Sequence, residues 1–320
     1  MAKLTLPQLL QAAKASFIAS GLLLLSACSP PHQPVNIAGN SWIGYQPFFI
    51  AAAIYSEPGL DSQLTIHPLP STSNVTRLMA ADQLDGGFLT LDEALVYQQG
   101  AEDPLCVAMV INESAGADAI VMKADWRKRP GQLSVAHEAT AVGGYMLKRA
   151  QQLKVFDGKE VTGVVATFNR HARMFSNDEI DGVVTFEPVL TQLRHSGARV
   201  VFDSSDISGE IIDVLAVKSS VWQQHSEHLD DRLRFFWDQV IDDFKALSPE
   251  VVKKLTENTQ LNSNQLRGAL ADIRLIGAMD ASSFNLQTAV EKIQDFLLTS
   301  GALSQSQSLN YCRAGTNNGQ

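Results

Sequence analysis

The sequence predicts an α/β protein with two related lobes, and three observations support this prediction. Short apolar runs alternate with helical patterns along most of the chain, as is typical of βα units. A block that reads as helix, turn and strand occurs twice, about one domain length apart. The chain has 320 residues, of which 45% are hydrophobic and 18% charged, so it can bury a core of ordinary size. This composition excludes a disordered or fibrous chain.

Residues 1–27 have the pattern of a signal peptide. Lys3 and Lys14 are the only charged residues there, and the apolar run 21–25 precedes two small residues. That run is too short for a transmembrane helix, which needs about 20 apolar residues. We therefore expect the chain to be exported.

The end of this segment resembles a bacterial lipobox. Leu25–Cys28 closes the apolar run, so we expect Cys28 to carry the lipid (palmitate among its acyl chains) and to become the first mature residue. Cleavage elsewhere beside an incidental cysteine is the alternative. Ser29 implies sorting to the outer membrane, and 28–34 reads as a stiff polar tether to the membrane. The predicted location is the lipid-anchored periplasm.

The body of the chain is acidic. Loss of the two signal-peptide lysines changes the formal net charge from −9 to −11. An acidic chain is a poor partner for nucleic-acid phosphates, so no nucleic acid is expected.

The elements follow from the type of pattern in each segment. Short apolar runs predict strands at 35–39, 64–69, 86–89, 106–111, 119–123, 133–136, 161–166, 182–186, 199–202 and 213–218. Apolar residues three or four apart predict helices at 73–82, 92–99, 142–153, 169–176, 188–196, 221–247, 249–257, 263–271 and 285–299. Since strands alternate with helices, we expect a mostly parallel sheet. The last hundred residues read almost entirely as helix.

The repeated block supports two lobes rather than one. Residues 77–86 match 173–182, and each copy continues into an apolar strand and an acidic helix start. Chance similarity of two αβ units is the alternative. If the lobes are related, Thr90, Asp92 and Glu93 face Thr185 and Glu187 across a cleft, because open α/β sheets bind ligands at the carboxyl ends of their strands.

The cysteines and histidines predict no metal or cofactor. Cys106 and Cys312 could pair in an oxidising compartment, although Cys106 also suits a buried small residue. His137 and Glu138 are adjacent and have no third ligand nearby. The nucleotide-binding, serine-hydrolase and zinc-protease motifs are absent. We therefore expect neither a metal site nor an enzyme.

Three stretches together resemble a known family. Residues 40–47 contain a W-x-G-Y-x-P pattern. The stretches 83–93 and 203–215 resemble the next two landmarks of the same family and come in the same order along the chain. The resemblance is to periplasmic solute-binding proteins of the nitrate/sulfonate/taurine and thiamine-precursor group, and it covers about 35–300. An enzymatic fungal branch has a cysteine-rich motif that this chain lacks, so its activity is not implied.

The resemblance implies a type II periplasmic-binding-protein fold. Lobe one would contain 35–119 and 212–320, and lobe two 120–211. Two crossover strands near 119–123 and 213–218 would form the hinge. Such a protein captures a small solute between closing lobes and delivers it to an inner-membrane ABC permease and its ATPase. The alternative is a ligand sensor for a membrane kinase or cyclase.

Nine residues are candidates for ligand contact. Trp42 and Tyr45 could stack on a planar group, or plug the core. Polar groups at helix starts could hold a ligand or merely cap the helix. The candidates at or beside predicted helix starts are Ser71, Thr72, Ser73, Thr90, Thr140 and Glu187. Ser114 follows the strand that contains Cys106, where its hydroxyl could hydrogen-bond a ligand.

The charge of the candidates predicts the kind of ligand. Asp92, Glu93 and Glu187 would repel a bare anion and attract amines or ring N–H groups. The hydroxyl-lined helix starts favour one acidic end. We expect a planar, pyrimidine-like or amine-bearing metabolite rather than an inorganic anion.

Overall fold

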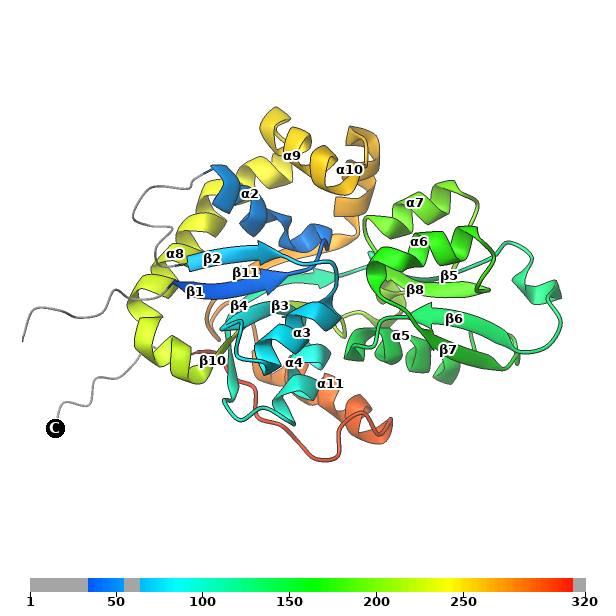
Figure 1. Ribbon diagram of the computed structural model, residues 1–320, viewed down its shortest axis with the longest axis horizontal. Helices are drawn as coiled ribbons and strands as arrows, with labels where there is room; N and C mark the ends of the chain where they lie inside the picture. The colour runs from blue at the N-terminus through cyan, green and yellow to red at the C-terminus, as the bar shows by residue number, and fades with distance from the viewer. Residues whose placement is uncertain (1–33, 55–63, 313–320) are drawn as a thin grey trace, which may run out of the picture. The chain divides into compact units, whose positions relative to one another are not determined.

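A computed structural model describes residues 34–54 and 64–312 (Figure 1). The predicted signal peptide 1–27 and the lipidation site Cys28 lie outside this range. No helix of the described part is long and apolar enough to cross a membrane.

Lobe one is built around a six-stranded sheet with the order β11-β4-β10-β3-β1-β2. Its strands are β1 (Val35–Gly39), β2 (Leu64–Pro68), β3 (Gly86–Thr90), β4 (Leu105–Ser114), β10 (Ile212–Lys218) and β11 (Ile273–Ala278). Its helices are η1 (Ile43–Tyr45), α2 (Gln46–Ile54), α3 (Thr72–Ala80), α4 (Leu91–Gln98), α8 (Ser219–Ala246), α9 (Pro249–Thr259), α10 (Ser263–Ala271) and α11 (Leu286–Thr299).

Lobe two is built around a five-stranded sheet with the order β7-β6-β8-β5-β9. Its strands are β5 (Asp118–Met122), β6 (Leu133–His137), β7 (Val161–Val165), β8 (Gly182–Phe186) and β9 (Arg199–Asp203). Its helices are η2 (Trp126–Lys128), α5 (Ala141–Gln152), α6 (Phe168–Ser176), α7 (Val189–His195) and η3 (Ser204–Ile207). The α/β class and the two lobes are as predicted.

Both sheets are mixed, so the prediction of a mostly parallel sheet is wrong. The pairs β1–β2, β1–β3, β6–β7 and β6–β8 are parallel. Strand β10 runs antiparallel to β3 and β4, and β5 runs antiparallel to β8 and β9. The physical reason is that β5 and β10 arrive from the other lobe and enter their sheets against the direction of the local βα units.

Helices cover both faces of each sheet because every central strand is apolar on both sides. In β10, Leu215 and Val217 face one core, whereas Val214 and Ala216 face the other. Helices α2 and α8 lie on one face of the six-stranded sheet and α3, α4 and α11 on the opposite face (Figure 1). In lobe two, α6 and α7 lie opposite α5 (Figure 1).

The sequence repeat corresponds to a structural repeat. After α3 and after α6 the chain makes the same turn, in which Asp82 and Asp178 have positive φ values of 53° and 61°. The aspartate that follows then accepts the main-chain N–H near the start of the lobe's first parallel strand. Asp85 accepts from Asn36 at 2.7 Å, and Asp181 accepts from Ser134 at 2.7 Å.

The chain passes between the sheets twice, from β4 to β5 and from β9 to β10. Hydroxyl groups join the two passages: the Oγ atoms of Ser114 and Ser204 are 2.8 Å apart. Gly116 N–H donates to Ser204 at 2.7 Å, and Asp118 N–H donates to Ser114 at 3.0 Å.

Besides the short η1, two elements of lobe one were not predicted. Residues 46–54 form α2, whose mostly apolar sequence packs against α8 and so shows no amphipathic period. Strand β11 lies in a region that reads as helix, and it completes the sheet at the edge of β4.

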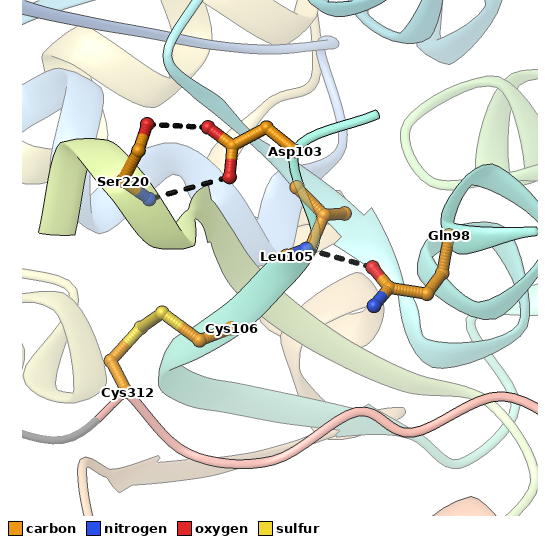
Figure 2. Close-up of a disulfide and its surroundings, with 6 residues drawn as sticks. All are labelled: Gln98, Asp103, Leu105, Cys106, Ser220 and Cys312. Carbon is orange, nitrogen blue, oxygen red and sulfur yellow. Dashed lines mark hydrogen bonds between the residues drawn. A yellow bond between two sulfur atoms is a disulfide. The ribbon is translucent and has the colours of Figure 1, made fainter. Parts of the chain in front are cut away.

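A disulfide joins Cys106 to Cys312 and fixes the C-terminal segment to β4 (Figure 2). Main-chain hydrogen bonds reinforce it, because Cys312 N–H donates to Val107 and Val107 N–H donates to Asn310. Cys106 and Cys312 therefore pair, which the sequence alone left open.

Candidate ligand-binding site

A small buried cavity lies where the carboxyl ends of the parallel strands of both lobes meet. Its volume is about 20 Å³, close to the space that one water molecule needs. It is lined by Asn40, Trp42, Tyr45, Thr72, Thr90, Glu93, Asp118, Val142, Phe186 and Asp213. All of these residues are buried. Because β5 and β10 run antiparallel to their neighbours, their first residues, including Asp118 and Asp213, reach the same edge.

Aromatic side chains form one part of the wall. Tyr45 stacks on Phe88 with the ring centroids 5.1 Å apart and donates its hydroxyl to Asp213 at 2.6 Å. Burial, and then the charge of Asp213, raise the pKa of Tyr45. Trp42 meets Phe186 edge-on at 5.7 Å. The predicted pair Trp42 and Tyr45 therefore packs into the core and also lines the cavity.

Carboxyl groups form another part of the wall. Burial raises the pKa of Asp118 to about 7 and that of Asp92 to about 6. Burial also raises the pKa of Glu93 and Asp213 well above the usual range, reinforced by Asp92 for Glu93 and by Asp118 for Asp213. No lining residue is Lys, Arg or His. The wall is therefore acidic and has no internal counter-charge.

Several polar atoms of this region have no hydrogen-bond partner. They include both carboxyl oxygens of Asp92, Glu93 Oε1, Asp213 Oδ2 and Trp42 Nε1. Trp42 Nε1 lies near enough to Asp213 to lower the pKa of that carboxyl, against the larger effect of burial. An unpartnered buried polar group carries a desolvation cost that a ligand can remove.

The start of α3 is capped by its own residues. Ser71 accepts from Asn74 N–H and donates to Asn74 Oδ1, and Thr72 Oγ1 accepts from Asn40 at 2.8 Å. Thr72 lines the cavity but Ser71 and Ser73 do not. The hydroxyl of Ser73 has no partner.

Glu138 of lobe two also lies at this helix start. Burial raises its pKa to about 7, and the nearby Phe168 N–H, Thr72 N–H and Ser71 hydroxyl partly oppose that rise. The bond from Phe168 N–H measures 3.4 Å. Since Phe168 begins α6, one carboxyl group lies at the amino ends of two helices, where negative charge is stabilised.

The remaining predicted residues divide into two groups. Thr90 lines the cavity, and Thr140 lies near Glu93, whose pKa its hydroxyl lowers. Ser114 and Glu187 do not line it. Ser114 belongs to the bridge between the two passages, and Glu187 accepts from Thr191 N–H and Oγ1 at the start of α7.

Sequence reasoning named no site role for Asn40, Val142, Phe186 or Asp213, and Asp118, at the predicted crossover, suits a structural role as well as a ligand contact. Asp213 lies opposite Thr90 in the β10–β3 pair. Only the pairing of distant strands reveals this neighbour. A sequence signal did exist for Asp213, since it falls within the third family-like stretch, 203–215.

Among the described residues, no group of three or more His, Cys, Asp or Glu side chains could hold a metal ion. The acidic side chains that line the cavity come from three different elements, α4, β5 and β10.

Comparison with known proteins identifies the fold. No protein-family model matches the chain, and no curated protein matches it in sequence. The alkanesulfonate-binding protein SsuA of Xanthomonas axonopodis pv. citri, bound to MOPS, has a similar structure with a TM-score of 0.69 and 12% identity. That match covers 88% of this chain and 96% of the other.

Two further solved structures agree. The zinc-bound ligand-binding component of an ABC-type import system from Staphylococcus aureus has a TM-score of 0.67 at 12% identity, covering 85% of this chain and 93% of that one. The periplasmic nitrate-binding protein NrtA of Synechocystis PCC 6803 has a TM-score of 0.64 at 10% identity, covering 88% and 84%. This chain therefore has the periplasmic-binding-protein fold, as the family resemblance implied.

Proposed function

We propose that this chain, which has the fold of the periplasmic binding proteins, is the solute-binding component of an ABC import system. The observation that carries the proposal is the buried polar cavity at the strand ends of both lobes, with unpartnered acceptors in its wall. Ligands of open α/β sheets bind at this position. The similarity to the import component of Staphylococcus aureus supports the same role.

The lobes must separate for a ligand to enter. Every residue that lines the cavity is buried, and the cavity itself holds about 20 Å³. We propose that lobe one (35–119 and 212–320) and lobe two (120–211) move as bodies about the two passages joined by Ser114 and Ser204. A ligand that touches both lobes binds the closed form more tightly and so drives closure.

The chain would act outside the cytoplasm, anchored by lipid on Cys28. The support is the lipobox-like sequence Leu25–Cys28, and Ser29 favours the outer membrane. Processing of Cys28→Ser, followed by detergent partition, tests this anchor. A variant that is processed and partitions like the parent would contradict it.

Native mass spectrometry tests the binding function. Protein purified without denaturant should carry a small molecule that is released unchanged on unfolding. Asp213→Asn should lose this molecule, whereas Asp238→Asn, the same change at an exposed position on α8, should keep it. If the parent holds no molecule and no metabolite library raises its melting temperature, the proposed function is wrong.

A further inference from the structure

We propose that the cleft takes an organic cation that presents several N–H donors, such as an ammonium or guanidinium compound. This inference rests on the proposed function and names the class of solute. It also predicts that the cleft rejects nitrate and simple sulfonates. Four features of the site favour this class of solute: the acceptors of the wall, their distribution, the aromatic rings and the carboxyl group near the start of α3.

The first observation is the excess of buried acceptors. Asp213 Oδ2 and Glu93 Oε1 have no partner, and their side chains line the cavity with 2% and 4% exposure. Both oxygens of Asp92, at the start of the same helix as Glu93, are also unpartnered. The unpartnered groups beside them that can donate are Trp42 Nε1 and the hydroxyls of Thr90 and Thr140, which are fewer than the unpartnered acceptor oxygens. Charged N–H groups satisfy such carboxylates with short, strong hydrogen bonds.

The second observation is that these acceptors are spread out. They come from α4 and β10, and no group of three or more His, Cys, Asp or Glu side chains in the described residues could hold a metal ion. A single ion would satisfy few of them. A cation with several N–H groups pointing in different directions fits this distribution better than a metal ion does.

The third observation is the aromatic part of the wall. Trp42 and Phe186 line the cavity together, and Phe186 also stacks on Phe168 with centroids 3.9 Å apart. An aromatic ring attracts a cation within about 6 Å of its centre. The rings therefore favour an organic cation over a strongly hydrated one.

The fourth observation concerns anions. The amino end of a helix is where an anionic ligand would be stabilised, and Thr72 at the start of α3 lines the cavity. Glu138 lies close enough to Thr72 N–H and the Ser71 hydroxyl for both to lower its pKa, and it accepts from Phe168 N–H at the start of α6. An anion at this place would meet Glu138, with Glu93 and Asp118 also in the wall.

Calorimetry on protein stripped of ligand by unfolding and refolding tests the inference. The cationic probes are agmatine and putrescine, and tetramethylammonium is the matched cation without N–H groups. Sodium nitrate, sodium methanesulfonate and zinc chloride are the competing classes. We expect binding of agmatine or putrescine, at least about tenfold weaker binding of tetramethylammonium, and none of nitrate or methanesulfonate.

Two variants locate the binding. Asp213→Asn keeps an acceptor for the Tyr45 hydroxyl but cannot ionise to pair with a bound cation, and Glu93→Gln is the same kind of change on α4. Each should weaken the cationic probe about 10- to 100-fold. Asp238→Asn, exposed on α8, should have no effect. Melting curves show whether each variant is folded.

The outcomes separate this inference from the proposed function. The inference would be overturned if nitrate, methanesulfonate or zinc bound more tightly than both N–H cations and if Asp213→Asn reduced that binding. The protein would then still be a solute-binding protein. Failure of both cations overturns it as well. If, in addition, the purified protein carries no small molecule and no library compound binds, the proposed function fails with it.

Discussion

Asp118 shows at the residue scale how burial controls the chemistry of the cleft. The first residue of β5 faces Ser114, Asp92 and Glu187, and burial raises its pKa from 3.8 to about 7. The folded state therefore binds this proton more tightly than the unfolded chain does. The free energy of unfolding gained from this proton is fully present below the pKa that Asp118 has in the unfolded chain. It is lost as the pH rises through about 7, the pKa in the folded state.

The protein without ligand should thus be more stable at pH 5 than at pH 8. Each pKa unit corresponds to about 1.4 kcal/mol, so we expect a melting temperature roughly 5 °C higher at pH 5. Asp118→Asn should reduce this difference, because one of the raised carboxyl groups is gone. Scanning calorimetry at several pH values measures it, and an identical pH dependence of parent and variant would contradict the assignment.

Trp42 contributes both packing and a polar atom. It is 3% exposed, it meets Phe186 edge-on, and its Nε1 has no partner. Trp42→Ala should cost about 3–5 kcal/mol of unfolding free energy because it leaves a cavity. Trp42→Phe should cost much less and yet weaken ligand retention, since it removes only the N–H and part of the ring. Urea unfolding measures the loss of stability and native mass spectrometry the retained ligand; equal losses of stability in the two variants would show that lost packing volume is not the main cause.

At the scale of elements, the repeated turn provides an equivalent hydrogen bond to a strand in each lobe. Asp85 and Asp181 each accept a main-chain N–H near the start of a lobe's first parallel strand. Asp85→Ala and Asp181→Ala should each cost about 1–3 kcal/mol of stability, because a half-buried N–H loses a charged acceptor. Asp125→Ala removes only an exposed pair with Arg129 and should cost less than about 0.5 kcal/mol. Equilibrium unfolding measures these losses, and an equal loss of stability in all three variants would refute the stabilising role of Asp85 and Asp181.

The disulfide acts on the C-terminal segment and on β4. It connects residues 206 positions apart, so its loss frees a long loop in the unfolded chain. Cys106→Ser should lower the unfolding free energy by about 2–5 kcal/mol. Cys312→Ser and the double variant should match it, since all three remove the same bond. A double variant much less stable than either single variant would mean that the thiols stabilise the fold separately.

At the scale of the whole molecule, function depends on the two lobes moving apart. The residues of both lobes enclose the cavity, so removal of a retained ligand should favour an open form. Small-angle scattering should give a smaller radius of gyration for protein as purified than for the same protein stripped by refolding. Adding back the retained molecule should restore the smaller value. Superimposable curves in all three states would rule out closure by ligand.

Local sequence patterns determined most of the elements. All ten predicted strands are present, because each contains a short apolar run that suits a sheet; the central strands are buried, whereas the edge strands β7 and β9 are partly exposed. The repeat of 77–86 in 173–182 predicted two related βα units because the turn after each helix needs the same aspartates. Helix α2 and strand β11 were missed, since their neighbours α8 and β4 hold them in place rather than a period of their own.

Only part of the candidate site could be predicted from the sequence. Trp42, Tyr45, Thr72 and Thr90 were named and do line the cavity, because they follow strands whose carboxyl ends point there. Tertiary structure alone decided that Asp213 lies opposite Thr90, that Glu138 of one lobe lies at the helix start of the other, and that Cys106 meets Cys312. These neighbours are set by antiparallel crossover strands and by packing between distant segments. A sequence pattern reflects the residues that are neighbours along the chain. The residues that contact one another in a buried site are determined only when the sheets assemble.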